Sequence, residues 1–272
     1  MTAGSSIRKT VAVVLGICLV CSFLVSTAAV KLQGIQKENQ RLDKIRNILA
    51  AGDLDREGDD LAAVYRERIE PVMIDLSSGE RIGEDRFDAL LNLETFDIDT
   101  LASHPSYGED VAADADPAKI RRRPKSMLVY FVRSDAGVAK VILPIYGMGL
   151  WSTLYGFLAL ENDLQTVAGI TFYRHGETPG LGGEVDNPRW KNGWKGKQAR
   201  DDEGRVVIRV LKDTVDPASE AARSQIDGLA GATITTRGVN NLVRYWLGED
   251  GYGPFLARLG RGVGTGGAEP DD

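Results

Sequence analysis

Two hydrophobic patterns divide the chain, and the first is a long uncharged run near the N-terminus. From Thr10 to Val30 the sequence carries no charged residue, and about 20 apolar residues are what a helix needs to span a bilayer. The run therefore predicts a transmembrane helix over residues 10–30. In residues 31–50 the apolar positions recur at steps of three, four and seven, which is typical of a continuing helix. These positions are Ile35, Leu42, Ile45, Ile48 and Leu49.

The second pattern consists of short runs of β-branched and aromatic residues, which are typical of strands. They predict strands over residues 127–132, 139–145, 153–160, 166–173 and 206–211. Turn-forming residues at 134–137 and 161–163 suit hairpin connections. Residues 61–76 are interpreted as a further helix or an extended segment, followed by a turn at 77–79. The predicted fold class is α+β, with one N-terminal transmembrane helix followed by a single domain built on a mixed or antiparallel sheet.

The uncharged run has a second interpretation, a cleaved signal peptide. Arg8 and Lys9 form a basic start, and residues 27–29 resemble a small-residue cleavage site. A signal core usually spans only about 7 to 15 residues, and the predicted helix continues beyond the run without a break. A retained anchor is therefore favoured.

The orientation of this anchor follows from its flanking charges, which conflict. Arg8 and Lys9 favour a cytoplasmic N-terminus, whereas Lys31, Lys37 and Arg41 favour the reverse. We expect a cytoplasmic N-terminus over residues 1–9, the transmembrane helix over 10–30, an extracytoplasmic domain over 31–258 and a flexible tail over 259–272. The polar segment 103–125 and the Gly-rich tail are both expected to be poorly ordered.

Composition excludes several classes of function. Hydrophobic residues make up 43% and charged residues 26% of the chain, which is typical of a folded domain. The net charge of -6 argues against nucleic-acid binding, since phosphate backbones attract basic surfaces. Cys18 and Cys21 are the two cysteines, so a disulfide framework is excluded. They are interpreted as small apolar residues of the anchor, and a metal cluster shared with another subunit is the alternative.

The familiar enzyme motifs for phosphate, dinucleotide and zinc binding are absent, and the candidate chemistry lies in three glycine-rich segments. They are residues 146–151, 175–184 and 227–236, and each follows or precedes a predicted element. Such segments are either sharp turns or places where a ligand approaches the backbone. Segment 227–236 leads into a predicted helix that Thr235 or Thr236 would cap. A phosphate on Thr233 would then lie near the positive end of the helix dipole. An ordinary capped helix after a turn is the alternative.

These segments in this order resemble the C subunit of the sodium-translocating NADH:quinone reductase. The resemblance covers most of the chain. Besides the anchor it rests on Leu42 to Lys44, Asn47 to Leu49, Asp75 with Leu76, Gly79 with Glu80, Gly147 to Trp151, Glu177 to Gly182, Trp190, Trp194, Gly196 with Lys197, and Gly231 to Thr233.

The resemblance implies an FMN-binding domain that carries FMN as a phosphoester on Thr233. It also implies a flavin transferase that uses FAD: the threonine oxygen attacks the pyrophosphate, AMP departs and FMN stays on the protein. The chain departs from the family at Ala230, where Ser or Thr is usual. The implied cofactor-binding residues are Thr233, Glu177, Thr178, Leu181, Gly182, Gly149, Leu150, Trp151, Asp227, Gly231 and Ala232. No catalytic acid or base and no metal ligand is expected, because the flavin itself does the electron chemistry.

The function implied is that of an electron-carrier subunit in the bacterial inner membrane. It would relay electrons between partner centres of a complex that oxidises NADH, reduces ubiquinone and exports sodium. The other subunits, the transferase and membrane lipid are its expected partners. One alternative is the G subunit of an Rnf-type ferredoxin:NAD oxidoreductase, which shares the covalent FMN. Another is a membrane-anchored scaffold protein without a cofactor.

Overall fold

The computed structural model describes residues 3–56, 58–135 and 137–264, and the chain divides into two compact units, Met1–Lys44 and Ile45–Asp272. The described residues of the first unit belong to α1 (Ala3–Ala51). Its apolar side chains, Val20 and Phe23 among them, are exposed, and α1 is the one helix in the described residues that is long and apolar enough to cross a membrane. Ile35 and Leu42 are exposed as well, whereas Ile48 and Leu49 are buried in the second unit.

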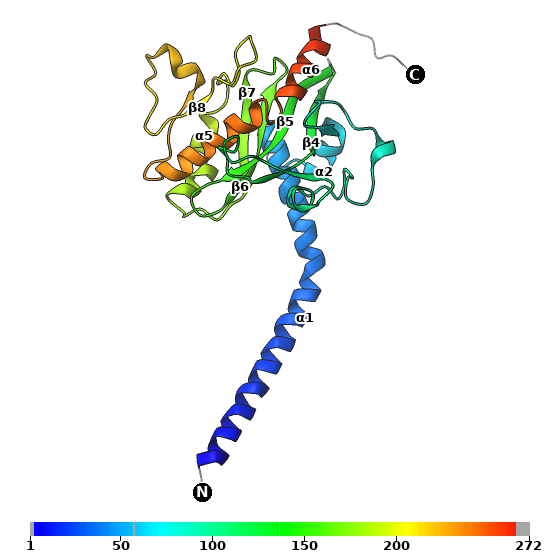
Figure 1. The fold of residues 1–272 in the computed structure, drawn as a ribbon, viewed down its shortest axis with the longest axis vertical. Coiled ribbons are helices and arrows are strands. Elements are labelled where there is room, and N and C mark those ends of the chain that lie inside the picture. The colour runs from blue at the N-terminus through cyan, green and yellow to red at the C-terminus, as the bar shows by residue number, and fades with distance from the viewer. Residues whose placement is uncertain (1–2, 57, 136, 265–272) are drawn as a thin grey trace. The chain divides into compact units, whose positions relative to one another are not determined.

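A five-stranded antiparallel sheet forms the centre of the second unit (Figure 1), and its strand order is β1-β4-β5-β6-β7. Its strands are β1 (Ile69–Asp75), β4 (Ser126–Ser134), β5 (Gly137–Met148), β6 (Thr153–Glu161) and β7 (Val167–Arg174). The sheet confirms the predicted α+β class and the strands predicted over 127–132, 139–145, 153–160 and 166–173. The hairpin predicted at 134–137 includes residue 136, which lies outside the described residues.

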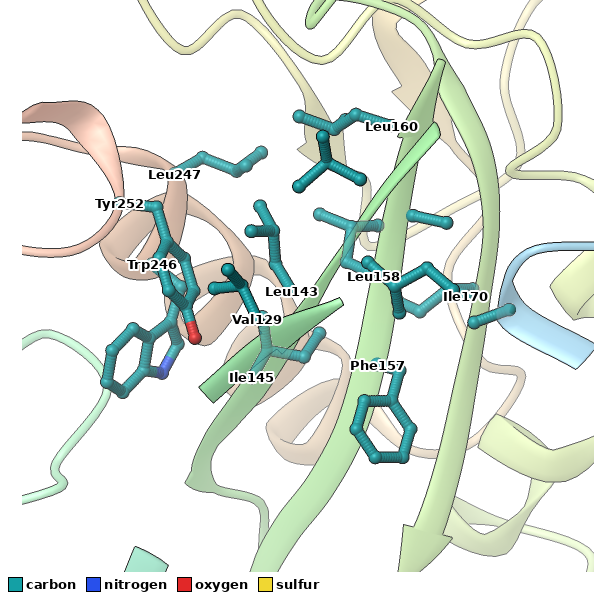
Figure 2. Packing of buried hydrophobic residues seen from close by; sticks show 14 of the residues in the cluster. Val129, Leu143, Ile145, Phe157, Leu158, Leu160, Ile170, Trp246, Leu247 and Tyr252 are labelled. Atoms are coloured by element: carbon teal, nitrogen blue, oxygen red, sulfur yellow. The ribbon is translucent and has the colours of Figure 1, made fainter. Parts of the chain in front are cut away.

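Helices cover both faces of this sheet. A Cβ built on Gly147 of β5 would meet Leu242 of α5 (Thr233–Leu247), and one built on Gly52, just after α1, would lie 3.1 Å from Ile142 of β5. Residues 142 and 147 have opposite parity, and alternate residues of a strand face opposite sides. The end of α1 and α5 therefore cover opposite faces. The indole N–H of Trp246 in α5 donates to the carbonyl of Tyr146 in β5 at 2.7 Å, and Figure 2 shows Trp246 among the buried side chains of the core.

The remaining elements are short and flank the sheet. They are α2 (Leu61–Arg68), η1 (Glu84–Arg86), α3 (Ile98–Ser103), β2 (Gly108–Asp110), β3 (Arg122–Pro124), η2 (Gly182–Asp186), α4 (Pro188–Asn192), β8 (Arg209–Val210), η3 (Glu220–Ser224), β9 (Gln225–Ile226) and α6 (Gly253–Gly264). Residues 61–76 thus contain both of the predicted alternatives, a helix and then a strand. The strand predicted at 206–211 shortens to β8, which pairs in parallel with β9 outside the main sheet.

The prediction of poor order over 103–125 is wrong. Strands β2 and β3 pair antiparallel within this segment. Arg122 forms an ion pair with Asp110 at 2.6 Å, and Arg123 forms one with Glu109, also at 2.6 Å. The Arg122 guanidinium also donates to the carbonyl of Ala102 in α3 at 2.8 Å. The charges that suggested a solvated loop therefore hold a folded one together.

The flexible tail predicted at 259–272 is wrong in its first part. Helix α6 continues to Gly264 because Phe255 and Leu256 are buried on one of its faces and Leu259 packs against the same core. Residues 265–272 of the predicted tail lie outside the described residues.

Candidate functional site

The carboxylate of Glu177 joins three segments that are distant in the sequence. The backbone N–H groups of Leu150, Trp151 and Ser152, in the turn between β5 and β6, donate to its Oε1 at 3.1, 2.9 and 3.2 Å. The hydroxyl of Thr235, in the first turn of α5, donates to its Oε2 at 2.6 Å. Glu177 itself follows β7. The β5–β6 turn, the loop after β7 and the start of α5 are therefore fixed to one another through a single side chain, which we call the Glu177 clamp.

The Glu177 clamp holds a buried negative charge, since the residue is 6% exposed. Burial on its own raises the pKa of a carboxyl group. The hydrogen bonds from Thr235 and from the N–H groups of Trp151, Leu150 and Ser152 outweigh burial and lower the pKa of Glu177. The carboxylate is therefore ionised at neutral pH and accepts hydrogen bonds only.

Glycines allow the three segments to approach this closely. A Cβ on Gly149 would lie 2.6 Å from Glu177 Oε1, and a Cβ on Gly182 would lie 2.5 Å from Thr235 Oγ1. Either distance is too short for a real side-chain atom. Gly149 of segment 146–151 and Gly182 of segment 175–184 are therefore needed for close packing around the clamp.

Thr233 is the first residue of α5 and its side chain is exposed. The predicted cap is wrong, because Ala232 occupies the N-cap position without a side-chain hydrogen bond. The hydroxyls of Thr235 and Thr236 have other partners: Thr235 donates to Glu177, and Thr236 accepts the N–H of Leu229 at 3.0 Å. The first N–H groups of a helix have no acceptor within the helix and lie at its positive end, so they surround Thr233 with donors.

Four large apolar side chains are exposed around these segments, and we call them the apolar rim. They are Leu150 (39% exposed), Trp151 (69%), Leu181 (44%) and Ile234 (54%). Among the described residues of the second unit, no other large hydrophobic side chain is this exposed. Leu181 lies against Gly231, where a Cβ would be 3.1 Å from its Cδ2, and Ile234 follows Thr233 directly. The rim is therefore an apolar surface beside an exposed hydroxyl.

The turn before Thr233 is tied down by its own side chains and backbone. Asp227 Oδ1 accepts the N–H of Val215 at 2.7 Å, and its carbonyl accepts the indole N–H of Trp190 at 2.9 Å. Gly231 has φ +70°, a conformation that glycine adopts without strain, and Ala232 is buried. The structure thus assigns Asp227 to holding the turn in place.

Comparison with known proteins identifies the family. A family model described as an FMN-binding domain matches residues 149–248. The C subunit of the Na⁺-translocating NADH-quinone reductase of Pseudomonas aeruginosa is 46% identical over 265 residues, which cover 96% of this chain and 99% of the relative. The chain belongs to this C-subunit family. The Yersinia pestis member is 45% identical and covers 95% of each chain.

Solved structures of the C-subunit family share the fold. The crystal structure of NqrC from Shewanella oneidensis matches with a TM-score of 0.73 and 34% identity, covering 82% of this chain and 98% of that one. The Parabacteroides distasonis member matches with a TM-score of 0.61 and 27% identity, covering 83% and 96%. Membership in the C-subunit family decides against the Rnf-type alternative.

The residues expected at the cofactor site differ in their exposure. Thr233, Leu150, Trp151 and Leu181 are exposed, whereas Glu177 is buried and Gly149 and Gly182 lie against it. Thr178 is exposed, and its carbonyl accepts the N–H groups of Leu181 and Gly183 at 3.1 and 2.9 Å.

Sequence reasoning missed Ser152 and His175 as parts of the site. Ser152 Oγ accepts the N–H of Gly176 at 2.6 Å. His175 Nε2 lies 2.8 Å from Asp186, and its Nδ1 accepts the N–H of Glu177 at 3.2 Å. Ser152 lies one residue beyond the segment 146–151 that the sequence singled out. The pairing of His175 with Asp186 has no sequence signal, because it depends on how the loop folds back.

The residues present fit FMN. A phosphoester needs an accessible hydroxyl, which Thr233 supplies, and phosphate oxygens are stabilised by N–H groups at a helix N-terminus. An isoalloxazine ring needs an apolar surface with nearby backbone donors, and the apolar rim lies beside the glycine-rich loop that follows Glu177. The donor set thus suits a phosphate at one end and an aromatic ring system at the other.

Proposed function

We propose that the chain is the electron-carrying C subunit of a sodium-translocating NADH:quinone reductase, with FMN attached through its phosphate to Thr233. When bound, FMN supplies the electron-transfer chemistry. Thr233 supplies the ester oxygen and the first turn of α5 stabilises the phosphate charge. The apolar rim covers the ring, and Glu177 holds these parts in register.

The observation that carries the proposal is the exposed hydroxyl of Thr233 at the first position of α5, beside the apolar rim. A buried hydroxyl could not be modified by another enzyme, and a hydroxyl in mid-helix would lack the unpaired N–H groups. Thr235 and Thr236 are buried and engaged in hydrogen bonds. Thr233 is thus the threonine of this turn that suits attachment.

The remaining parts of the proposal concern the surroundings of the protein. The apolar helix over residues 10–30 is retained as an anchor in the bacterial inner membrane, and the domain over 31–258 lies on the periplasmic side. Covalent attachment would then keep a small cofactor from being lost outside the cytoplasm. A flavin transferase loads Thr233 from FAD with release of AMP. The loaded protein joins the other subunits of a translocase that oxidises NADH, reduces ubiquinone and exports sodium.

The test is the substitution Thr233→Val, which removes the ester oxygen and conserves the shape of the side chain. The full chain is produced together with a flavin transferase, and flavin fluorescence is read in a denaturing gel. We expect fluorescence in the wild type and none in Thr233→Val. The matched control is Thr214→Val, an exposed threonine outside the site, which should fluoresce like the wild type. Covalent flavin in folded Thr233→Val protein would refute the assignment.

A further inference from the structure

A concave region lies between residues 189–197, which include the end of α4, and residues 215–227, which include η3 and β9. It is a cleft of about 600 Å³. Its wall includes Arg189, Trp190, Lys195, Lys197, Arg223 and Asp227, and we call it the basic cleft. The sequence had singled out Trp190, Gly196 and Lys197, and of these only Trp190 contacts the flavin site, through its hydrogen bond to Asp227.

The basic side chains of this cleft differ in what they contact. Lys195 pairs with Asp53 at 2.6 Å, and the Lys197 ammonium donates to the carbonyl of Ala222 at 2.7 Å. Arg189 and Arg223 are exposed, and within the described ranges neither guanidinium has a hydrogen-bond or ion-pair partner. A guanidinium presents five donors in a rigid fork that matches carboxylates. The cleft therefore offers unused donors from each of its two walls.

Trp190 gives the basic cleft a fixed aromatic surface. Its indole N–H donates to the carbonyl of Asp227 at 2.9 Å, and its ring packs edge-on against buried Trp194 with centroids 5.5 Å apart. Trp and Arg are the residue types that most often dominate protein–protein binding energy. An anchored tryptophan in a cleft that also contains Arg189 and Arg223 is therefore suited to binding a polypeptide segment.

The charge of the basic cleft is opposite to that of the chain as a whole. The chain carries 39 acidic and 33 basic residues, whereas the cleft collects four basic side chains and one acidic one. Exposed charges of one sign steer a partner of the opposite sign and set its orientation. The occupant is therefore an acidic segment.

The position of Asp227 connects the basic cleft with the acceptor threonine. Asp227 lies in the wall of the cleft and precedes Thr233 by six residues. The turn between them is held at two points, since Gly228 N–H donates to the carbonyl of Asp213 at 3.0 Å and Leu229 N–H donates to Thr236. An enzyme that acts on the Thr233 hydroxyl approaches this tied turn, whose first residue, Asp227, is also part of the cleft wall.

We propose that the basic cleft docks an acidic segment of the flavin transferase and so directs that enzyme to Thr233. This inference rests on the proposed function, because it assumes that Thr233 is the residue loaded. Docking at the cleft lowers the KM of the transferase for its protein substrate. It leaves the transfer step itself unchanged, because the residues that line the cleft include neither Thr233 nor Glu177.

The experiment measures the rate of flavin attachment to the full chain with purified transferase and FAD, over a range of acceptor concentrations and salt. The test variant is Arg189→Glu with Arg223→Glu. We expect kcat/KM for the acceptor to fall about tenfold or more, as charge reversals at a steering surface lower the association rate, with kcat nearly unchanged. Added salt should lower kcat/KM for the wild type more than for the variant, because screening removes the attraction that the variant already lacks.

The matched control is Arg66→Glu with Arg86→Glu, which makes the same change in net charge at two exposed arginines outside the cleft. It should be loaded like the wild type. Wild-type kinetics in the cleft variant would overturn the inference. Normal loading combined with failure to assemble with the other subunits would overturn it as well, by assigning the cleft to one of them. Loading of Thr233→Val, or no covalent loading of the wild type, would instead refute the proposed function.

Discussion

Glu177 is the residue on which the geometry of the site depends, because its side chain joins three segments of the chain. Its carboxylate accepts three backbone N–H groups and one hydroxyl, so all of these donors point inward and away from the exposed face. Replacing the carboxylate by an amide would turn an NH₂ group toward some of these donors. The β5–β6 turn and the start of α5 would then no longer be held by the same side chain.

We predict that Glu177→Gln lowers the free energy of unfolding by about 2 kcal/mol at pH 7, since hydrogen bonds to a charged group contribute about 1.5–3 kcal/mol each and part of the network survives. The folded-state pKa of Glu177 lies below its ordinary value of 4.5. The stabilisation is therefore complete above about pH 4.5 and is lost as the pH falls through the folded-state pKa.

Urea unfolding of the wild type and of Glu177→Gln, measured between pH 7 and pH 3, tests whether the stabilisation by Glu177 is lost as the pH falls. The stability difference between the two proteins should shrink as the pH falls. Glu94→Gln, which changes an exposed glutamate without a side-chain contact in the described part of the chain, should track the wild type throughout. A difference between the wild type and Glu177→Gln that stays constant down to pH 3 would show that the carboxylate is not held by these donors.

The contacts of single side chains could not be predicted from the sequence. Glu177 was expected beside the flavin, as the resemblance implied, and the structure places its carboxylate in the packing behind the exposed face. Asp227 was also expected in the cofactor site, and the structure shows that its own contacts are with Val215 and Trp190. A sequence shows that a residue belongs to a motif, but the direction of its side chain depends on contacts with residues 12 to 58 positions away.

At the scale of elements, α5 shows how hydroxyls can serve tertiary contacts instead of capping. The helix begins at Thr233, so Thr236 lies in its first turn and accepts the N–H of Leu229. Both residues are buried. We predict that Thr236→Val leaves this N–H unpaired and lowers the free energy of unfolding by about 1–3 kcal/mol, while covalent flavin is retained.

Thermal unfolding together with in-gel flavin fluorescence separates these two effects. Thr214→Val is again the control, because it makes the same substitution at an exposed position. It should change the melting temperature little. Loss of covalent flavin from folded Thr236→Val protein would move the site of attachment and contradict the assignment of Thr233.

The elements that sequence patterns predicted best are the strands of the central sheet. Each of β4 to β7 carries a run of apolar residues bounded by turn residues, and this local pattern is sufficient because both faces of the sheet are covered. Residues 103–125 and the end of α6, from residue 259, were predicted wrongly because their order depends on contacts that the local pattern does not show. Arg122 and Arg123 look like solvated charges until their partners Asp110 and Glu109 are known, and the glycines of α6 hide the apolar face formed by Phe255 and Leu256.

At the scale of the whole molecule, the topology of the chain in the membrane can be predicted. The described chain contains one helix apolar enough to span a membrane, and the proposal places the domain over residues 31–258 outside the cytoplasm. Protease added to intact spheroplasts should therefore digest this domain, while a cytoplasmic marker protein survives. Full protection of the domain under the same conditions would reverse the orientation.

The central claim is that Thr233 carries FMN through a phosphoester, and mapping the flavin to one residue tests it most directly. The wild-type chain, produced with a flavin transferase, is denatured and digested with trypsin. Cleavage after Arg223 and Arg237 releases residues 224–237, which contain Thr233, Thr235 and Thr236. Fragmentation of this peptide in a mass spectrometer is predicted to place one FMN, less one water, on Thr233. Flavin that is released on denaturation, or that maps to any other residue, would contradict the account.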